Sequence, residues 1–172
     1  RLRRMDAASL PRLYDEKVPL SPELTRRHLR ALREALAAYH DDGREHGDLY
    51  VNYVLLRPDG RIHLIGSASE VDEEGRRPGH NPSMYAPELV LGERTSPASD
   101  IWSVGVYAYW MLMGRLPFQA SNPVDLIQAI SRGRLDEMDP ALPPPLVAFT
   151  MRCLRRDPAD RFADARTALA AL

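Results

Sequence analysis

The spacing of apolar positions along the chain predicts a mainly helical fold. Ser21 and Pro22 provide a helix cap and a first-turn proline, and leucines then recur at helical intervals, which predicts a helix over 22–41. A shorter helix is predicted before it, from Ala7 to Tyr14. Similar periodicity, with glycines placed as stops, predicts further helices over 98–113, 123–132, 144–155 and 161–171.

The middle of the chain has a different pattern. Apolar, β-branched and aromatic residues fill 49–56 and 61–65, and a Pro-Asp-Gly turn separates the two runs. This arrangement predicts a β-hairpin. From Ser69 to Pro87 no period is sustained, and glycine, proline and charged residues predominate, so a long loop is expected.

Composition limits the classes of partner. With 172 residues, of which 44% are hydrophobic, the chain can bury one core. Its 23 Lys and Arg against 24 Asp and Glu give no overall field toward nucleic acid, so no nucleic-acid partner is expected. The longest apolar run, from Ile101 to Met113, is shorter than the roughly 20 residues that cross a bilayer, so no membrane contact is expected within this segment.

Two further features concern the cellular setting. Cys153 is the only cysteine, which excludes an internal disulfide and favours a buried thiol in a reducing, cytoplasmic location. The chain starts at Arg1 and not at a methionine, which is consistent with a segment of a longer protein.

Four motifs occur in a fixed order. They are His-Gly-Asp at 46–48, Ala-Pro-Glu at 86–88, Asp-x-Trp-Ser-x-Gly from Asp100, and Asp-Pro-x-x-Arg ending at Arg161. In this order the chain resembles the C-terminal lobe of a eukaryotic-like Ser/Thr protein kinase of the bacterial type. The resemblance implies a mainly α fold: the helical bundle of a kinase C-lobe with a small β-hairpin and the N-lobe absent.

The same resemblance implies how the chain is organised. Residues 1–172 are expected to form a single domain. Its parts are expected to be a catalytic-loop hairpin over 46–65, an activation-segment-like loop over 66–88 and a helical part over 98–172.

Four residues match positions that are structural in the family. The resemblance implies that Glu88 pairs with Arg161, and that Asp100 accepts hydrogen bonds from the backbone of the catalytic loop. It implies that His46 packs beneath that loop. A buried ion pair such as the first would order the loop, because the loss of one partner leaves a charge stranded.

The catalytic positions depart from the family pattern. Asp48 occupies the place of the base, but Tyr53 and Gly66 stand where the family has its two metal ligands, and Tyr50 replaces a phosphate-binding lysine. A phenol is a poor ligand for a hard cation. Asn52 and the acidic residues over 70–74 are the nearest possible replacements for the two metal ligands. The Asn52 side chain is expected on the opposite face of the strand, and the acidic residues are interpreted as a solvated loop. No metal and no nucleotide cofactor are therefore expected.

The leading hypothesis is a pseudokinase that acts as a protein-interaction or regulatory scaffold, with Asp48 retained but silent. The alternative is the C-lobe segment of a longer Ser/Thr protein kinase, which would bind Mg-ATP and transfer phosphate to protein hydroxyls. A small-molecule phosphotransferase is a third class, because His-Gly-Asp also resembles its catalytic phrase, but Tyr53 breaks that phrase as well. The expected partner is another protein, and the residues do not identify it.

Overall fold

The computed structural model describes residues 8–9, 18–47, 49, 53–65 and 82–172, and the statements below concern those residues. The α-helices are α2 (Pro22–Asp41), α3 (Pro87–Val90), α4 (Pro97–Met113), α5 (Pro123–Arg132), α6 (Pro144–Cys153) and α7 (Ala165–Leu169). Short 3-10 turns cover Pro82–Met84 and Pro158–Asp160. The strands are β1 (Ala8–Ser9), β2 (Val54–Leu56) and β3 (Ile62–Leu64).

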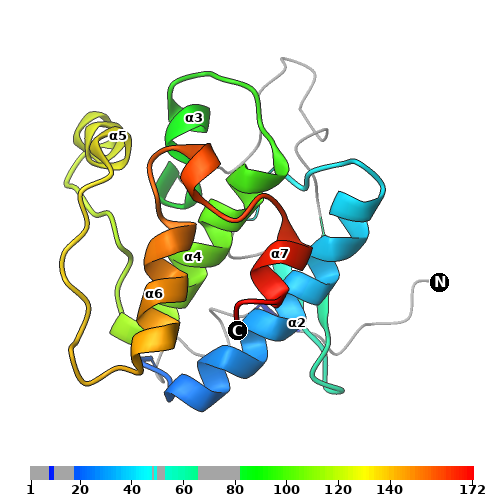
Figure 1. The fold of residues 1–172 in the computed structure, drawn as a ribbon. Coiled ribbons are helices and arrows are strands. Elements are labelled where there is room, and N and C mark those ends of the chain that lie inside the picture. The colour runs from blue at the N-terminus through cyan, green and yellow to red at the C-terminus, as the bar shows by residue number, and fades with distance from the viewer. Residues whose placement is uncertain (1–7, 10–17, 48, 50–52, 66–81) are drawn as a thin grey trace.

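Helix α4 forms the centre of the fold. It packs against α2 and α6, and α7 packs on α2 (Figure 1). Nearly all of its side chains are buried, Trp102 and Tyr107 among the largest, which is why the helix is apolar all round instead of on one stripe. The predicted buried helix over 98–113 is thus present, and among the described residues no helix has the length and apolar character needed to cross a membrane.

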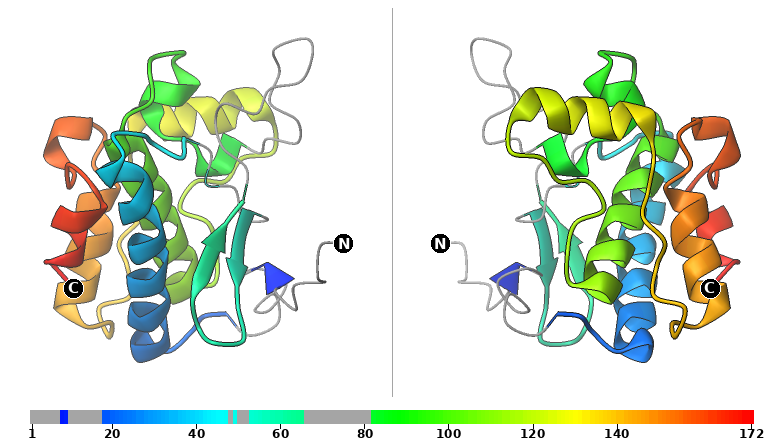
Figure 2. Two further views of the ribbon diagram at one scale, coloured as in Figure 1. Left: turned by 90° about the vertical axis from the view of Figure 1, so that its right-hand side faces the viewer. Right: turned by 90° about the vertical axis from the view of Figure 1, so that its left-hand side faces the viewer.

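Helix α2 begins and ends where its caps predict. The Ser21 side chain accepts a hydrogen bond from the Leu24 backbone N–H, Pro22 occupies the first turn, and Leu29, Leu32 and Leu36 are buried. The sheet lies on one side of α2, and α6 and α7 lie on the other (Figure 2). The hairpin therefore packs against α2 through β3.

The sheet has three antiparallel strands in the order β1-β2-β3. Val54 pairs with Leu64 within the predicted hairpin, whose strands are shorter than predicted. The helix predicted from Ala7 to Tyr14 is wrong at Ala8–Ser9, which is a strand. These two residues pair with Leu55–Leu56, because the outer edge of β2 offers backbone partners that a sequence pattern cannot reveal.

The C-terminal helices end differently from the prediction. Helix α6 stops at Cys153, two residues early, and α7 starts at Ala165, after Asp164 caps it by accepting from the Thr167 N–H. Arg161 is extended, with ψ of −173°, instead of helical. Its side chain is engaged elsewhere. Cys153 is fully buried, and burial raises the pKa of its thiol, so it is the inert thiol that the sequence predicted.

Candidate functional site

Asp100 anchors the backbone of His46 and Gly47. Its carboxylate accepts hydrogen bonds of 2.8 Å from both the His46 and the Gly47 backbone N–H groups. The side chain is 1% exposed, so these charge-assisted bonds form away from water. Gly47 has φ of 72°, a region that glycine occupies without strain. The first turn of α4 therefore fixes the backbone immediately before Asp48.

His40 is a member of this cluster that the sequence did not assign. The Ala165 backbone N–H donates to its Nδ1 at 3.0 Å, so Nδ1 must accept, and the ring hydrogen lies on Nε2. Nε2 then donates to Asp100 Oδ2 at 2.9 Å. His40 thereby joins the end of α2 to the starts of α4 and α7. The only signal for it in the sequence is its position in the last turn of the helix.

The His46 side chain is buried. Its ring lies edge-on to Tyr39 with centroids 5.3 Å apart. Just before it, Glu45 accepts a 2.7 Å hydrogen bond from the Thr95 hydroxyl. Residues 45–47 therefore contact α2, α4 and the segment between α3 and α4.

Glu88 and Arg161 form a second buried cluster. The guanidinium donates in parallel to Glu88 Oε1 and Oε2, each at 2.8 Å. The remaining Arg161 donors reach three backbone carbonyls, those of Ala98, Arg155 and Arg156. All five donors of the guanidinium are thus used, which is the condition under which a buried arginine is tolerated.

The electrostatics of Glu88 follow from these contacts. Burial alone would raise the pKa of the carboxyl, but hydrogen bonds from Arg161 and Ser99 outweigh burial and hold the pKa below its usual range. The Ser99 hydroxyl donates to Glu88 Oε1 at 2.7 Å. Since Ser99 and Asp100 are adjacent in α4, one helical turn connects the two clusters.

The remaining predicted site residues are only partly described. Asp48, Tyr50 and Gly66 lie outside the described residues, as do Asn52 and the acidic run over 70–74. Tyr53 is half-buried immediately before β2, and its carbonyl accepts from the Ile65 N–H at 3.0 Å. The side chain that Tyr53 offers as a metal ligand is a phenol, which does not suit Mg²⁺. Within the described ranges no group of three or more His, Cys, Asp or Glu side chains is arranged to hold a metal.

Comparison with known proteins gives a consistent result. The family model of the protein kinase domain matches residues 2–171. Serine/threonine-protein kinase PkaA of Streptomyces coelicolor is 30% identical over 166 residues, which cover 91% of this chain and 30% of that protein. Serine/threonine-protein kinase PknL of Mycobacterium tuberculosis is 29% identical over 175 residues, 94% of this chain and 43% of that protein.

A human relative is similar over a shorter part. The hormonally up-regulated neu tumor-associated kinase of Homo sapiens is 35% identical over 159 residues, 85% of this chain and 22% of that protein. The chain therefore spans less than half the length of each of these relatives.

Proposed function

The chain belongs to the protein kinase family, and we propose that it is a catalytically deficient member, a pseudokinase, that serves as a protein-interaction or regulatory scaffold. The observation that carries this proposal is a contrast. Asp100 and the Glu88–Arg161 pair make the buried contacts that the resemblance associates with an ordered kinase C-lobe. By contrast, Tyr53 and Gly66 stand where the resemblance places the two metal ligands.

The contrast matters because phosphoryl transfer depends on cations. The protein does little covalent chemistry in such a reaction, and the metal neutralises the charge on the transferred phosphate. Tyr53 and Gly66 cannot supply the two oxygen ligands, and Tyr50 cannot replace the lysine charge. Asp48 on its own is a base without an activated phosphate to act with. We therefore propose that the chain uses no metal or nucleotide cofactor.

A scaffold needs a contact surface, and α5 offers one. Val124 and Ile127 on this helix are 64% and 37% exposed, and Leu91 on the neighbouring segment after α3 is 55% exposed. Helices α3 and α5 pack together, so the three apolar side chains belong to one region of the molecule. We propose a protein partner in the cytoplasm that contacts Val124, Ile127 and Leu91.

A second candidate is supported by the names of the relatives. Two of those described above are serine/threonine-protein kinases, and the chain spans only part of each. In this alternative, residues 1–172 are the C-lobe of a longer Ser/Thr protein kinase. That kinase would bind Mg-ATP and transfer phosphate to protein hydroxyls, with Asp48 as the base.

A phosphotransfer assay separates the two candidates. The purified full-length gene product is incubated with radiolabelled ATP, Mg²⁺ and a generic acceptor protein, beside an Asp48→Asn variant as the matched control. We expect no incorporation above the level of that control. Incorporation by the wild type that is lost in Asp48→Asn would overturn the pseudokinase proposal.

A further inference from the structure

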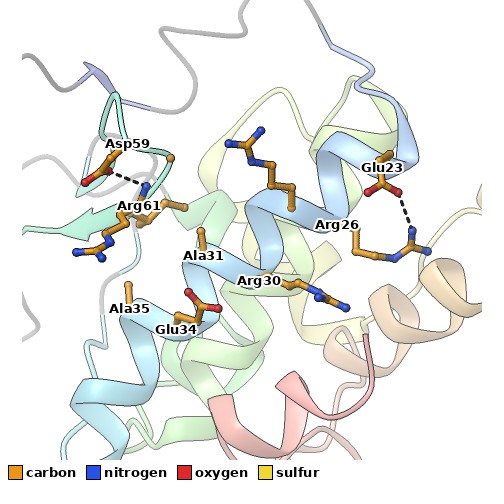
Figure 3. A pocket seen from close by; sticks show the side chains of 11 residues that line it. Glu23, Arg26, Arg30, Ala31, Glu34, Ala35, Asp59 and Arg61 are labelled. Atoms are coloured by element: carbon orange, nitrogen blue, oxygen red, sulfur yellow. Dashed lines mark hydrogen bonds and ion pairs between the residues drawn. The ribbon is translucent and has the colours of Figure 1, made fainter.

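A groove lies between α2 and the turn of the hairpin. It encloses about 670 Å³, and Ala31, Ala35 and Ile62 contribute its apolar surface. In Figure 3 the two alanines lie between the turn residues Asp59 and Arg61 on one side and Arg30 on the other. The small alanine side chains leave room that a larger residue would fill. The residues that line the groove do not include His46 and Gly47, which Asp100 anchors.

The charges along the groove do not cancel. Its lining holds four arginines and three carboxylates. Glu23 pairs with Arg26 at 3.4 Å. Asp59 accepts from the Arg61 backbone N–H at 3.0 Å and lies 3.8 Å from Arg57 Nε, so this carboxylate is also engaged.

Three arginines of the groove, Arg27, Arg30 and Arg61, have no carboxylate side chain as a partner among the described residues. Arg30 donates instead to the backbone oxygen of Leu172 at 3.4 Å. All three side chains are exposed. Glu34 is the single lining carboxylate that could oppose them. The groove therefore has an excess of positive charge on a chain whose formal net charge is −1.

The arginines come from both walls. Arg27 projects from α2 to the turn, where a Cβ built on Gly60 would lie 3.0 Å from its Nη2. Arg61 lies on the turn itself. A carboxylate in the groove could therefore be approached from the helix and from the hairpin. Guanidinium groups suit this task, because their planar donors match a carboxylate in pairs.

The dimensions indicate the kind of ligand. The lining residues on α2 run from Glu23 to Ala35, which at the rise of an α-helix is about 18 Å. An extended chain of about five residues has that length. A groove of this length with an apolar floor and cationic walls fits a short strand of peptide better than a compact ion.

We propose that this groove binds an extended acidic segment of the protein partner. The inference rests on the proposed scaffold function and gives that partner a chemical property, namely a run of Asp and Glu residues. The partner's carboxylates would pair with Arg27 and Arg61, and its backbone would lie over Ala31 and Ala35.

A second arginine cluster gives a matched control. Arg132, Arg134 and Arg156 gather at the C-terminal end of α5. There Arg156 donates to the Ser131 carbonyl at 2.8 Å, and cations at a helix C-terminus are favourable without any ligand. Arg132 and Arg134 are exposed, so replacing them changes the net charge by the same amount as replacing Arg27 and Arg61.

The test is a fluorescence anisotropy titration of the full-length gene product. The probe is a fluorescein-labelled peptide of about six alternating Asp and Glu residues. The comparison peptide has Asn and Gln in their place. We expect the double variant Arg27→Gln with Arg61→Gln to bind the acidic probe about 10-fold more weakly than wild type. The double variant Arg132→Gln with Arg134→Gln should stay within about 2-fold.

A gain-of-affinity variant guards against misfolding. Glu34→Gln removes the opposing carboxylate and should tighten binding of the acidic probe by about 2-fold. A misfolded protein would not produce that change. Thermal melting of each variant provides the folding control.

Several results would overturn the proposal. They are equal losses in the two double variants, equal binding of the amide peptide, and a single-stranded oligonucleotide that binds with the same dependence on Arg27 and Arg61. A wild-type dimer in sedimentation that dissociates in the Arg27→Gln, Arg61→Gln variant would assign the groove to a second copy instead. The titration contains no ATP, so its failure is distinguishable from a failure of the pseudokinase proposal.

Discussion

Glu88 and Arg161, which are 73 positions apart in the sequence, form a bidentate ion pair in the interior of the fold. The pair joins the helix that follows the loop to the segment before α7. Arg161 also lies over the Trp102 ring, 5.1 Å from its centroid. The pair therefore connects α3, the central helix α4 and the segment before α7. None of these connections depends on a nucleotide.

Removing one partner should be costly. Arg161→Met would leave the Glu88 carboxylate buried with only Ser99 as a side-chain donor, and we expect a loss of about 3–5 kcal/mol in the free energy of unfolding. Urea denaturation at neutral pH measures it. The exposed pair of Arg166 and Asp41 provides the control, since Arg166→Met should change the urea midpoint far less. Comparable losses in the two variants would contradict the account.

The same pair predicts a pH dependence. Because the folded-state pKa of Glu88 lies below its ordinary value of 4.5, the unfolded chain binds a proton first as the pH falls. The contribution of Glu88 to stability is then present above about pH 4.5 and is lost as the pH falls toward the lowered pKa. Glu88→Gln lacks this titration, so the stability difference between wild type and variant should narrow below pH 4.5. Urea midpoints of both proteins across this range test it, and a constant difference would contradict it.

The sequence predicted those features whose causes are local. The cap at Ser21 and the periodic leucines locate α2, and the predicted fold class, mainly α with a small antiparallel hairpin as in a kinase C-lobe, is confirmed. The predicted start of the last helix at residue 161 was wrong, because Arg161 is extended and pairs with Glu88, which is distant in the sequence. The strand β1 was missed because its partner lies across the sheet.

The candidate site divides in the same way. The order of the motifs pointed to Asp100 and Glu88, because both residues belong to motifs that resemble those of a kinase C-lobe. His40 was not found, since its role depends on Asp100, 60 positions away, and on the start of α7. The groove beside α2 was also invisible, because its walls come from two elements that only the fold brings together.

Asp100 should control the order of the loop before Asp48. In Asp100→Asn one carboxylate oxygen is replaced by an NH₂ group, which is a hydrogen-bond donor. That NH₂ group must face either the Gly47 N–H or the His46 N–H and His40 Nε2–H. All of these groups are donors, so none can accept a hydrogen bond from the new amide. We expect the Gly47 amide to exchange with solvent about 10-fold faster or more, as measured by hydrogen exchange. The exposed Asp136→Asn should leave that rate unchanged. An unchanged rate in Asp100→Asn would contradict the assignment.

Gly105 should be sensitive to a single methyl group. A Cβ at this position would lie 2.7 Å from Cys153 Cβ and 2.8 Å from Leu154 Cγ, because α4 and α6 approach closely there. Helix propensity alone would make Gly105→Ala stabilising by about 1 kcal/mol. Overpacking costs about 1–3 kcal/mol, so we expect a net loss of stability or at best no gain. A higher melting temperature than wild type would contradict the close packing.

The most direct test of the central claim is the melting temperature of the full-length gene product with and without ATP, each with and without Mg²⁺. A ligand that binds only the folded state raises stability by RT ln(1 + [L]/Kd), which is about 2.7 kcal/mol at 100 times Kd. The account predicts no Mg²⁺-dependent shift in a sample that unfolds cooperatively. A clear upward shift that requires Mg²⁺ would contradict it, and would mean that residues other than Tyr53 and Gly66 supply the metal ligands.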